Sequence, residues 1–261
     1  MLHGTPASEG IGLGRVMIVE EAKLEYNNVT VTDTEAEVER FRNAVKIFCD
    51  NTAAQADALK ASAGKKEAEI LEGHIQMMKD PYMCGEIEKL IDNGQCAEAA
   101  LEYMCDMFIS MFSATDDELT QQRAADVKDL KTSMLSILLG VKEVKLSAAP
   151  KGTVVVAKEL TPSMTAGINK ENIVGIITET GGKTSHSAIL ARALEIPAVL
   201  SVNGAVSKLS AGEYVIVDGS EGVVINEPDD AVIQEYNTKR INFLKELSLI
   251  HISEPTRQAE I

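Results

Sequence analysis

The sequence predicts an α/β domain into which an all-helical subdomain is inserted. A short strand-like run at residues 15–19 follows a glycine-punctuated start. Residues 32–141 then contain a single proline, Pro81, and otherwise favour helices. After this block, runs rich in valine and isoleucine return and alternate with a helical stretch at residues 185–194. The α/β domain is therefore expected to be discontinuous along the chain.

The expected boundaries follow these changes in the sequence. The α/β domain takes residues 1–20 and 146–228, and the helical subdomain takes residues 30–142. Residues 229–246 are expected to form one closing helix, because apolar side chains recur in them at helical spacing. Short links between the helices of the subdomain predict antiparallel neighbours, and hence a bundle.

Cap and turn residues place the elements inside each part. Thr32 and Glu35 form a capping-box pattern that would open the first helix. Pro81 suits a first helical position, and Gly94 and Gly140 suit helix ends. These signals predict helices at residues 66–78, 81–92, 97–112 and 117–139, and strands at residues 152–157, 173–177, 198–200, 213–218 and 222–225.

The composition excludes several functional classes. Hydrophobic residues make up 45% and charged residues 25% of the 261, which is typical of a globular chain with a substantial core. A net charge of -15 argues against a nucleic-acid partner, because phosphate backbones are bound by Lys and Arg. No apolar run is long enough for a transmembrane helix, and the start lacks the layout of a secretion signal, so the cytoplasm is expected. The four cysteines show no C-x-x-C spacing, so buried reduced thiols are expected rather than disulfides or a zinc site.

Acidic residues are concentrated in one part of the helical subdomain. Residues 81–120 hold nine acidic side chains against one basic side chain, Lys89. Two interpretations are open. The charges form a solvated helical face, or they form a docking surface for a basic protein, since complementary fields speed encounter.

The segment that carries chemistry runs from Thr178 to Arg192. A predicted strand leads into Gly181 and Gly182 and then into a helix whose first turn holds His186. Glycines let the backbone approach a ligand, and the N–H groups at a helix start attract phosphate. A neutral imidazole there is a nucleophile for a phosphoryl group, with the hydroxyls of Thr184 and Ser185 around its oxygens.

Two other interpretations of this segment are possible. A single histidine is more often structural than catalytic. Gly182-Lys183-Thr184 also ends like a nucleotide-binding P-loop, but Ile177 occupies the position where that pattern needs its first glycine. The segment is therefore not a nucleoside-triphosphate loop.

Residues 181–192, followed by Ile196-Pro197-Ala198-Val199, resemble the phosphohistidine motif of the phosphoenolpyruvate-utilising enzymes. Within that group the chain is similar to Enzyme I of the bacterial sugar phosphotransferase system. The dikinase and synthase members place a long ATP-binding region before the histidine, and no such region precedes it here. The similarity to Enzyme I covers about residues 1–246 and is carried by residues 4–11, 72–75, 123–127 and 160–163 as well as by the histidine motif.

The resemblance implies a phosphohistidine swivelling domain with His186 as the phosphorylated residue. It implies that His186 takes phosphate from phosphoenolpyruvate on a separate C-terminal barrel, which dimerises in the family, and passes it to a histidine-containing phosphocarrier protein. Thr165 matches a threonine that orients the histidine ring, and Arg192 either touches the phosphate or is a surface residue. The implied phosphate environment comprises Gly181, Gly182, Thr184, Ser185 and Arg192.

The phosphocarrier docks on the helical subdomain in the family. Five residues of this chain fall in the corresponding region, and for His74 and the two methionines a packing role is an equal alternative. These residues are Glu67, His74, Met77, Met78 and Arg123.

Some positions depart from the family pattern. Glu9 stands where proline is common, and Leu200-Ser201 replaces the usual Val-Gly. Both are interpreted as local backbone variation that does not touch the histidine motif.

The end of the chain is expected to be foreign to the protein. Residues 247–261 resemble a translated adapter from DNA library preparation, so the natural sequence is expected to end near Glu246 in a truncated gene. Nothing resembles the phosphoenolpyruvate-binding barrel, so no cofactor is expected in this chain, and Mg²⁺ is expected on the missing domain. Two alternatives remain: a nitrogen-regulatory paralogue of Enzyme I, and a non-catalytic protein-docking module.

Overall fold

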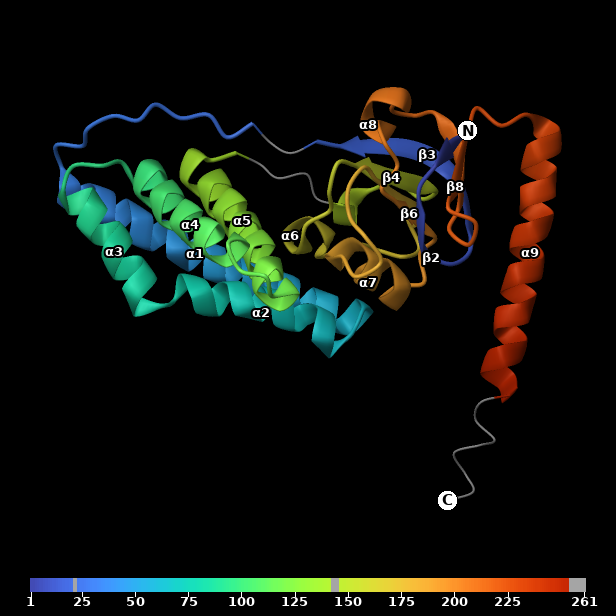
Figure 1. Cartoon of the computed structure of the whole chain (residues 1–261), viewed down its shortest axis with the longest axis horizontal. Coiled ribbons are helices and arrows are strands. Elements are labelled where there is room, and N and C mark those ends of the chain that lie inside the picture. Colours follow the sequence, from blue (N-terminus) through green and yellow to red (C-terminus); the bar gives the residue numbers. More distant parts are fainter. Residues whose placement is uncertain (21–22, 142–145, 254–261) are drawn as a thin grey trace, which may run out of the picture. The chain divides into compact units, whose positions relative to one another are not determined.

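The computed structural model describes residues 1–20, 23–141 and 146–253, and the chain separates into two compact units. One unit contains residues 1–20, 147–160 and those from 168 onwards, and the other contains residues 21–146 and 161–167. Figure 1 shows the strands with α7 and α8 in the first unit and helices α1 to α5 in the second. An α/β unit and an all-helical unit thus confirm the predicted fold class.

The α/β unit is built on one mixed sheet. Among the described residues its order is β1-β8-β7-β3-β4-β5-β6-β2, in which β3, β4, β5 and β6 are parallel neighbours and the other pairs are antiparallel. The predicted strands lie in its centre, whereas β1 and β2 escaped prediction because they are short edge strands. The strands are β1 (Leu2–His3), β2 (Thr5–Ser8), β3 (Ile11–Val19), β4 (Thr153–Ala157), β5 (Ile173–Thr178), β6 (Ala198–Leu200), β7 (Tyr214–Asp218) and β8 (Val223–Asn226).

The two ends of the sheet are joined by one residue. Gly4 separates β1 from β2, and its N–H donates to the carbonyl of Gly222 at 2.9 Å. A Cβ at this position would lie 2.4 Å from the carbonyl oxygen of Leu200, so only glycine fits. Because the chain passes directly from one end of the strand order to the other, the sheet curls round on itself.

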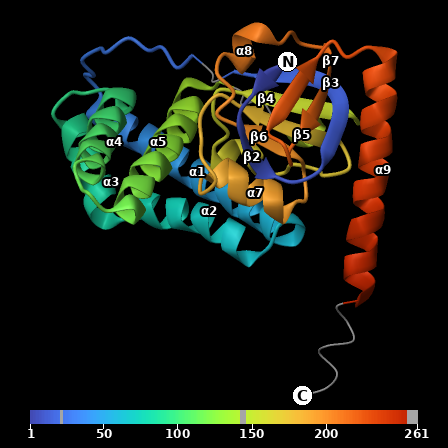
Figure 2. The ribbon, with the colours of Figure 1, turned by 45° about the vertical axis from the view of Figure 1, so that its right-hand side comes forward.

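The parallel strands are buried on both faces. All five residues of β4 are buried, as are the last four of β5, and both strands are rich in β-branched residues. Such continuous apolar runs are typical of parallel strands covered on two sides. Two helices accompany them, α7 (His186–Ala193) and α8 (Ala205–Lys208), and Figure 2 shows these on opposite sides of the strands.

The helical unit contains five long helices that agree closely with the predicted ranges. They are α1 (Thr34–Ser62), α2 (Lys65–Met78), α3 (Pro81–Asp92), α4 (Ala97–Ser113) and α5 (Glu118–Leu139), and a 3-10 turn, η1, follows at Leu146–Ala148 between the units. Pro81 opens α3 and Gly140 closes α5 with a φ of 65°, as predicted.

The predicted capping box at the start of α1 is wrong. Asp33, and not Thr32, is the N-cap residue, and its carboxylate accepts the N–H of Ala36 at 3.1 Å. The cap therefore lies one position later, and its carboxylate is also favoured by the positive end of the helix dipole.

The core of the helical unit holds large side chains from every long helix. Phe41 and Phe48 of α1 are almost fully buried with Leu101 of α4 and Leu130 of α5. Arg40 bridges Glu37 and Glu98 at 2.7 and 2.8 Å, which links α1 to α4 at the edge of this core. None of the helices in the described part of the chain is long and apolar enough to cross a membrane.

One short segment departs from the predicted boundaries. Residues 161–167, which include helix α6 (Pro162–Thr165), connect β4 to β5 in the sequence but belong to the helical unit. The cause is Asp129 of α5, whose carboxylate accepts the N–H and the hydroxyl of Ser163 at 3.0 and 2.6 Å. The second part of the α/β unit is therefore interrupted at residues 161–167.

The closing helix is longer than predicted. Helix α9 spans Asp230–Ser253, so it continues seven residues beyond Glu246. Leu247, Leu249 and Ile250 are compatible with a helix, which explains why the boundary was misplaced. Val232, Ile233 and Tyr236 pack α9 against the sheet residues Leu13, Ile216 and Ile225. Residues 254–261 of the presumed adapter lie outside the described residues.

Candidate functional site

The predicted histidine lies on a strand–loop–helix connection. Strand β5 ends at Thr178, the loop spans residues 179–185, and His186 is the first residue of α7. The chain then returns through β6, which is parallel to β5. Loops at the carboxyl ends of parallel strands are where α/β sheets place their ligands.

The loop is held in shape by the sheet beneath it. The N–H groups of Glu179 and Thr180 donate to Ala157 and Lys158 at 3.1 and 3.0 Å. The Glu179 carboxylate caps the first turn of α8 by accepting the N–H of Val206 at 2.9 Å. The base of the loop is therefore continuous with β4 and β5.

Gly181 and Gly182 occupy the turn before the helix for different reasons. Gly181 has a φ of 103°, and a Cβ there would lie 3.1 Å from the Ser185 hydroxyl, so the turn requires glycine. A Cβ on Gly182 would meet nothing within 4 Å. The space beside Gly182 is open to an approaching group.

The start of α7 combines a cap with a half-buried imidazole. Ser185 is the N-cap, and its hydroxyl accepts the N–H of Ala188 at 3.4 Å. His186 is half-buried. The next residue, Ser187, anchors the start of the helix, because its hydroxyl donates to the Leu160 carbonyl at 3.1 Å. The Thr184 side chain is exposed next to them. Gly181, Gly182, Thr184, Ser185 and His186 follow one another along this loop, and their role around a phosphate stays a prediction.

Arg192 has a clear structural role in this loop. Its Nη1 donates to the carbonyl oxygens of Lys183 and Ala7, at 3.0 and 3.1 Å. The guanidinium therefore ties the histidine loop to the edge strand β2. A contact between Arg192 and a phosphate stays a prediction.

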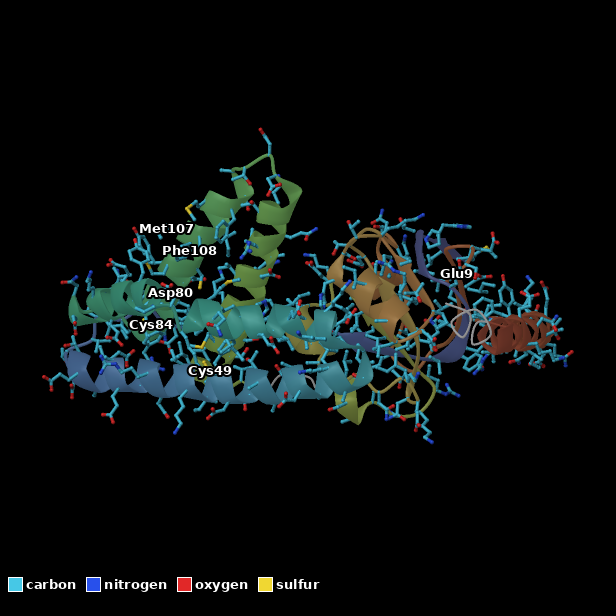
Figure 3. The ribbon with its side chains drawn as sticks, turned by 90° about the horizontal axis from the view of Figure 1, so that it is seen from below. Glu9, Cys49, Asp80, Cys84, Met107 and Phe108 are labelled. Atoms are coloured by element: carbon cyan, nitrogen blue, oxygen red, sulfur yellow. The ribbon has the colours of Figure 1, made fainter. Side chains whose placement is uncertain are left out.

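The expectation that neither departure from the family pattern touches the histidine motif is wrong for Ser201, and Glu9 lies beside the motif. The Ser201 hydroxyl donates to the Gly181 carbonyl at 2.6 Å. Glu9, labelled in Figure 3, lines a cavity of about 580 Å³ together with Lys183 and Arg192. Linear distance along the chain concealed both relationships.

Thr165 belongs to the helical unit, whereas His186 belongs to the α/β unit. The Thr165 side chain is fully buried at the end of α6, and its hydroxyl donates to the Pro162 carbonyl at 3.0 Å. The expected action of Thr165 on the ring stays a prediction.

The predicted docking residues differ in their exposure. His74 is 2% exposed and Met78 is fully buried, so for these two the packing interpretation is correct. His74 lies between two carboxylates, with Nε2 3.8 Å from Asp126 and Nδ1 3.9 Å from Asp129. The other three predicted residues reach the surface: Glu67 and Met77 are half-buried and Arg123 is exposed.

An apolar groove of about 500 Å³ opens in the helical unit beside Met77. Phe108 and Phe112 of α4 form one wall, with their rings stacked at a centroid distance of 6.1 Å. Figure 3 labels Phe108 and Asp80, which line this groove from α4 and from the start of α3. Sequence reasoning missed the phenylalanines because their spacing on α4 also fits a core position.

The acidic bias of residues 81–120 is partly neutralised within the unit. Five of the nine carboxylates pair with basic side chains. Arg40, Arg42 and Lys131 supply three of these partners from α1 and α5. This pairing favours the interpretation of these charges as a solvated, internally paired face, and the groove is the better candidate for docking.

No metal site accompanies these features in the described ranges. Within residues 1–20, 23–141 and 146–253, no group of three or more His, Cys, Asp or Glu side chains is arranged to hold an ion.

Comparison with known proteins identifies the family. Two family models match, described as PEP-utilising enzyme, N-terminal, at residues 3–123, and PEP-utilising enzyme, mobile domain, at residues 149–222. A solution NMR structure of Enzyme I matches with a TM-score of 0.81 and 35% sequence identity, over 93% of this chain and 99% of that chain. The chain belongs to the Enzyme I family.

Curated Enzyme I relatives carry the name phosphoenolpyruvate-protein phosphotransferase. The protein of Listeria innocua is 39% identical over 243 residues, which cover 93% of this chain and 42% of the relative. The protein of Staphylococcus carnosus is 38% identical over 247 residues, covering 94% and 43%. The chain thus spans about two-fifths of the length of these Enzyme I proteins and corresponds to their N-terminal part.

A structure of the N-terminal domain of the nitrogen-type Enzyme I is also similar, with a TM-score of 0.62 and 25% identity over 91% of this chain. Both values are lower than those for the Enzyme I solution structure. This chain is therefore less similar to the nitrogen-type structure than to the Enzyme I solution structure.

Proposed function

We propose that this chain carries a phosphoryl group on His186 and exchanges it with a histidine-containing phosphocarrier protein, as part of phosphoenolpyruvate-dependent sugar uptake. The observation that supports the proposal most strongly is the placement of His186 at the first turn of α7, directly after an open glycine turn. Membership of the Enzyme I family supports the same chemistry.

The transfer step is an exchange between two imidazoles. A ring nitrogen of His186 attacks the phosphorus of the phosphohistidine on the partner. A new N–P bond forms as the partner's N–P bond breaks, and the partner's imidazole leaves. Because the bonds formed and broken are of the same kind, the step is expected to be reversible.

The loop supplies stabilisation for the transferred group. N–H groups at a helix start and the exposed Thr184 hydroxyl are suited to the oxygens of a phosphoryl group. Thr165 is proposed to orient the imidazole. Arg192 is proposed to act chiefly through the loop that it holds.

The phosphocarrier is proposed to dock on the helical unit at the apolar groove beside Met77. Phe108 and Phe112 offer aromatic anchors, which commonly carry the binding energy of interfaces. Glu67 and Arg123 are proposed to contribute at its rim. His74 and Met78 are proposed to shape α2 from below, since both are buried.

The experiment that tests the proposal is transfer from a radiolabelled phosphocarrier to the full chain. The wild-type chain and His3→Ala should become labelled, because His3 is exposed in the same unit but distant from the motif in sequence. His186→Ala should take up no label. Label that persists in His186→Ala would overturn the assignment.

Loading from phosphoenolpyruvate is proposed to require the remaining part of Enzyme I, which the relatives contain beyond the matched region. Incubation of this chain with phosphoenolpyruvate and Mg²⁺ should therefore leave it unlabelled. A non-catalytic docking module would differ from this proposal, because it would bind the phosphocarrier without accepting phosphate from it. Adding the C-terminal part of a relative to this chain, together with phosphoenolpyruvate, Mg²⁺ and the phosphocarrier, tests whether that part restores labelling of this chain.

A further inference from the structure

Ser201 reaches the phosphohistidine loop from the strand that follows it. It lies directly after β6, and its hydroxyl donates to the Gly181 carbonyl at 2.6 Å. The residue has a φ of 55°, in the left-handed region that disfavours residues with a Cβ. The Enzyme I pattern has glycine at this position. This chain therefore carries a serine where the backbone favours glycine, and the serine makes a contact that glycine cannot make.

A second side chain holds the same loop two peptides further on. Arg192 Nη1 donates to the Lys183 carbonyl at 3.0 Å and to the Ala7 carbonyl at 3.1 Å. Ser201 and Arg192 thus hold the two carbonyls that flank Gly182, one from the end of β6 and the other from α7. Each holds a carbonyl oxygen and leaves the amide of the next residue unused.

The orientation of these carbonyls determines the orientation of two amides. In a trans peptide the N–H points away from the preceding C=O, and no cis bond occurs in the described residues. Holding the Gly181 and Lys183 carbonyls therefore directs the N–H groups of Gly182 and Thr184 away from Ser201 and Arg192. In the described part of the chain neither N–H donates a hydrogen bond within the protein.

The N–H groups of Gly182 and Thr184 are available to a group that approaches the loop beside Gly182. The space next to Gly182 is free of other atoms within 4 Å of a built Cβ. Gly182 and Thr184 precede His186 by four and two residues, and they belong to the turn that leads directly into α7, closed by the Ser185 N–H and the Gly182 carbonyl at 2.9 Å. Preorganised N–H groups stabilise phosphoryl oxygens without reorganising during the reaction.

We propose that Ser201 is a positioning residue for phosphoryl transfer: its hydroxyl holds the Gly181–Gly182 peptide so that the Gly182 N–H is presented to the phosphoryl group on His186. This rests on the proposed function of His186. The role belongs to this chain rather than to the family, because the usual glycine has no hydroxyl. Arg192 holds the Lys183–Thr184 peptide in the same way.

The test compares Ser201→Ala and Ser201→Gly with Ser207→Ala in the full 261-residue chain. Ser207 is a matched control, because its exposed hydroxyl donates to the Gly204 carbonyl at 3.0 Å in the same unit and away from the loop. Three quantities are measured: the ¹³C chemical shift of the Gly181 carbonyl, the midpoint of thermal unfolding, and the rate of phosphate uptake from a phosphorylated phosphocarrier.

Both Ser201 variants should shift the Gly181 carbonyl resonance and slow phosphate uptake about fivefold, the factor expected for loss of one hydrogen bond. Ser201→Gly should unfold at the wild-type temperature or above, because glycine relieves the left-handed backbone. A slower but equally stable Ser201→Gly separates positioning from general stability. Ser207→Ala should match the wild type in all three quantities.

Two results would overturn the inference in distinguishable ways. If wild type and both Ser201 variants take up phosphate on His186 at the same rate, Ser201 does not position the loop, and the proposed function stands. If the wild type takes up no phosphate on His186, the proposed function fails and the positioning role fails with it. The Gly181 carbonyl shift then still reports whether the hydrogen bond exists.

Discussion

The carboxylate of Asp129 accepts two hydrogen bonds from Ser163, one from its N–H at 3.0 Å and one from its hydroxyl at 2.6 Å. The two residues lie 34 positions apart, on α5 and α6. Asp129 is 3% exposed, and such charge-assisted bonds are among the stronger ones in proteins. This contact explains why residues 161–167 belong to the helical unit, although they connect two strands.

Replacing Asp129 is expected to destabilise the helical unit. Asp129→Ala removes both bonds and leaves the Ser163 N–H without its acceptor, while the Ser163 hydroxyl keeps the Thr161 hydroxyl at 3.1 Å, at a cost of about 1–3 kcal/mol. Thermal unfolding measures the loss. The control is Asp57→Ala, which removes an exposed carboxylate from α1 and should change stability little. Equal midpoints for the two variants would contradict the importance of this contact.

The Glu37 carboxylate is expected to contribute a pH-dependent stability. Its hydrogen bond with Arg40 lowers the pKa of Glu37 below the ordinary 4.5, although burial opposes this, and the N–H of Ala97 adds to the lowering. Because the folded pKa is below the unfolded one, the stabilisation is fully present above the unfolded pKa. It is lost as the pH falls through the folded pKa.

Glu37→Gln should therefore cost about 1–3 kcal/mol of unfolding free energy at neutral pH and progressively less as the pH falls below about 4. Chemical denaturation at several pH values measures the difference. Glu39→Gln on the same helix is the control, because Glu39 is exposed. A difference between wild type and Glu37→Gln that stays constant down to about pH 2 would show that Glu37 does not act through its charge.

The four cysteines are expected to react slowly with thiol reagents in the native chain. All four are free thiols; three are buried and Cys84 is half-buried. Burial raises the pKa of Cys84 to about 11 and that of Cys105 to about 12, so little reactive thiolate exists near neutral pH. Labelling followed by mass measurement should show four rapid modifications only after denaturation. Rapid native labelling of Cys105 would contradict the packing of α4.

Shortening the chain after Glu246 is expected to leave thermal stability unchanged. The described contacts of α9 with the sheet come from earlier residues, namely Val232, Ile233 and Tyr236. Phe243 also packs against this unit, because its ring lies next to Gly10. A Cβ built on Gly10 would be only 3.2 Å from that ring. Phe243→Ala in the shortened chain should cost about 1–3 kcal/mol. If removal of residues 247–261 alone lowers the midpoint by many degrees, these residues are part of the fold and not an added tail.

Much of the fold could be predicted because its signals are local. The long helices show apolar periodicity, and α1, α3 and α5 each begin at a capping aspartate. The central strands carry continuous β-branched runs. The glycine turn and the helix start before His186 are likewise encoded within a few residues. A one-residue error at Asp33 arose because two adjacent side chains can both cap a helix.

The remaining features depend on contacts between distant parts of the chain. Ser201 reaches Gly181 only because β6 returns beside β5, and the positive φ of Ser201 cannot be read from its sequence neighbours. The bond between Asp129 and Ser163 is of the same kind. The resemblance to Enzyme I placed His74 and Met78 in the docking region with packing as an equal alternative, because a position in the sequence does not tell which face of α2 a side chain takes. Burial decides that question.

The central claim is that His186 is the phosphorylated residue, and direct localisation of the phosphate tests it most directly. The chain is incubated with a phosphorylated phosphocarrier, then analysed by ³¹P NMR and by mass spectrometry of peptides kept at alkaline pH. We predict an acid-labile phosphoramidate signal and a single phosphorylated peptide that contains His186. Phosphate on His3, His74 or any hydroxyl, or no acid-labile phosphate at all, would contradict the account.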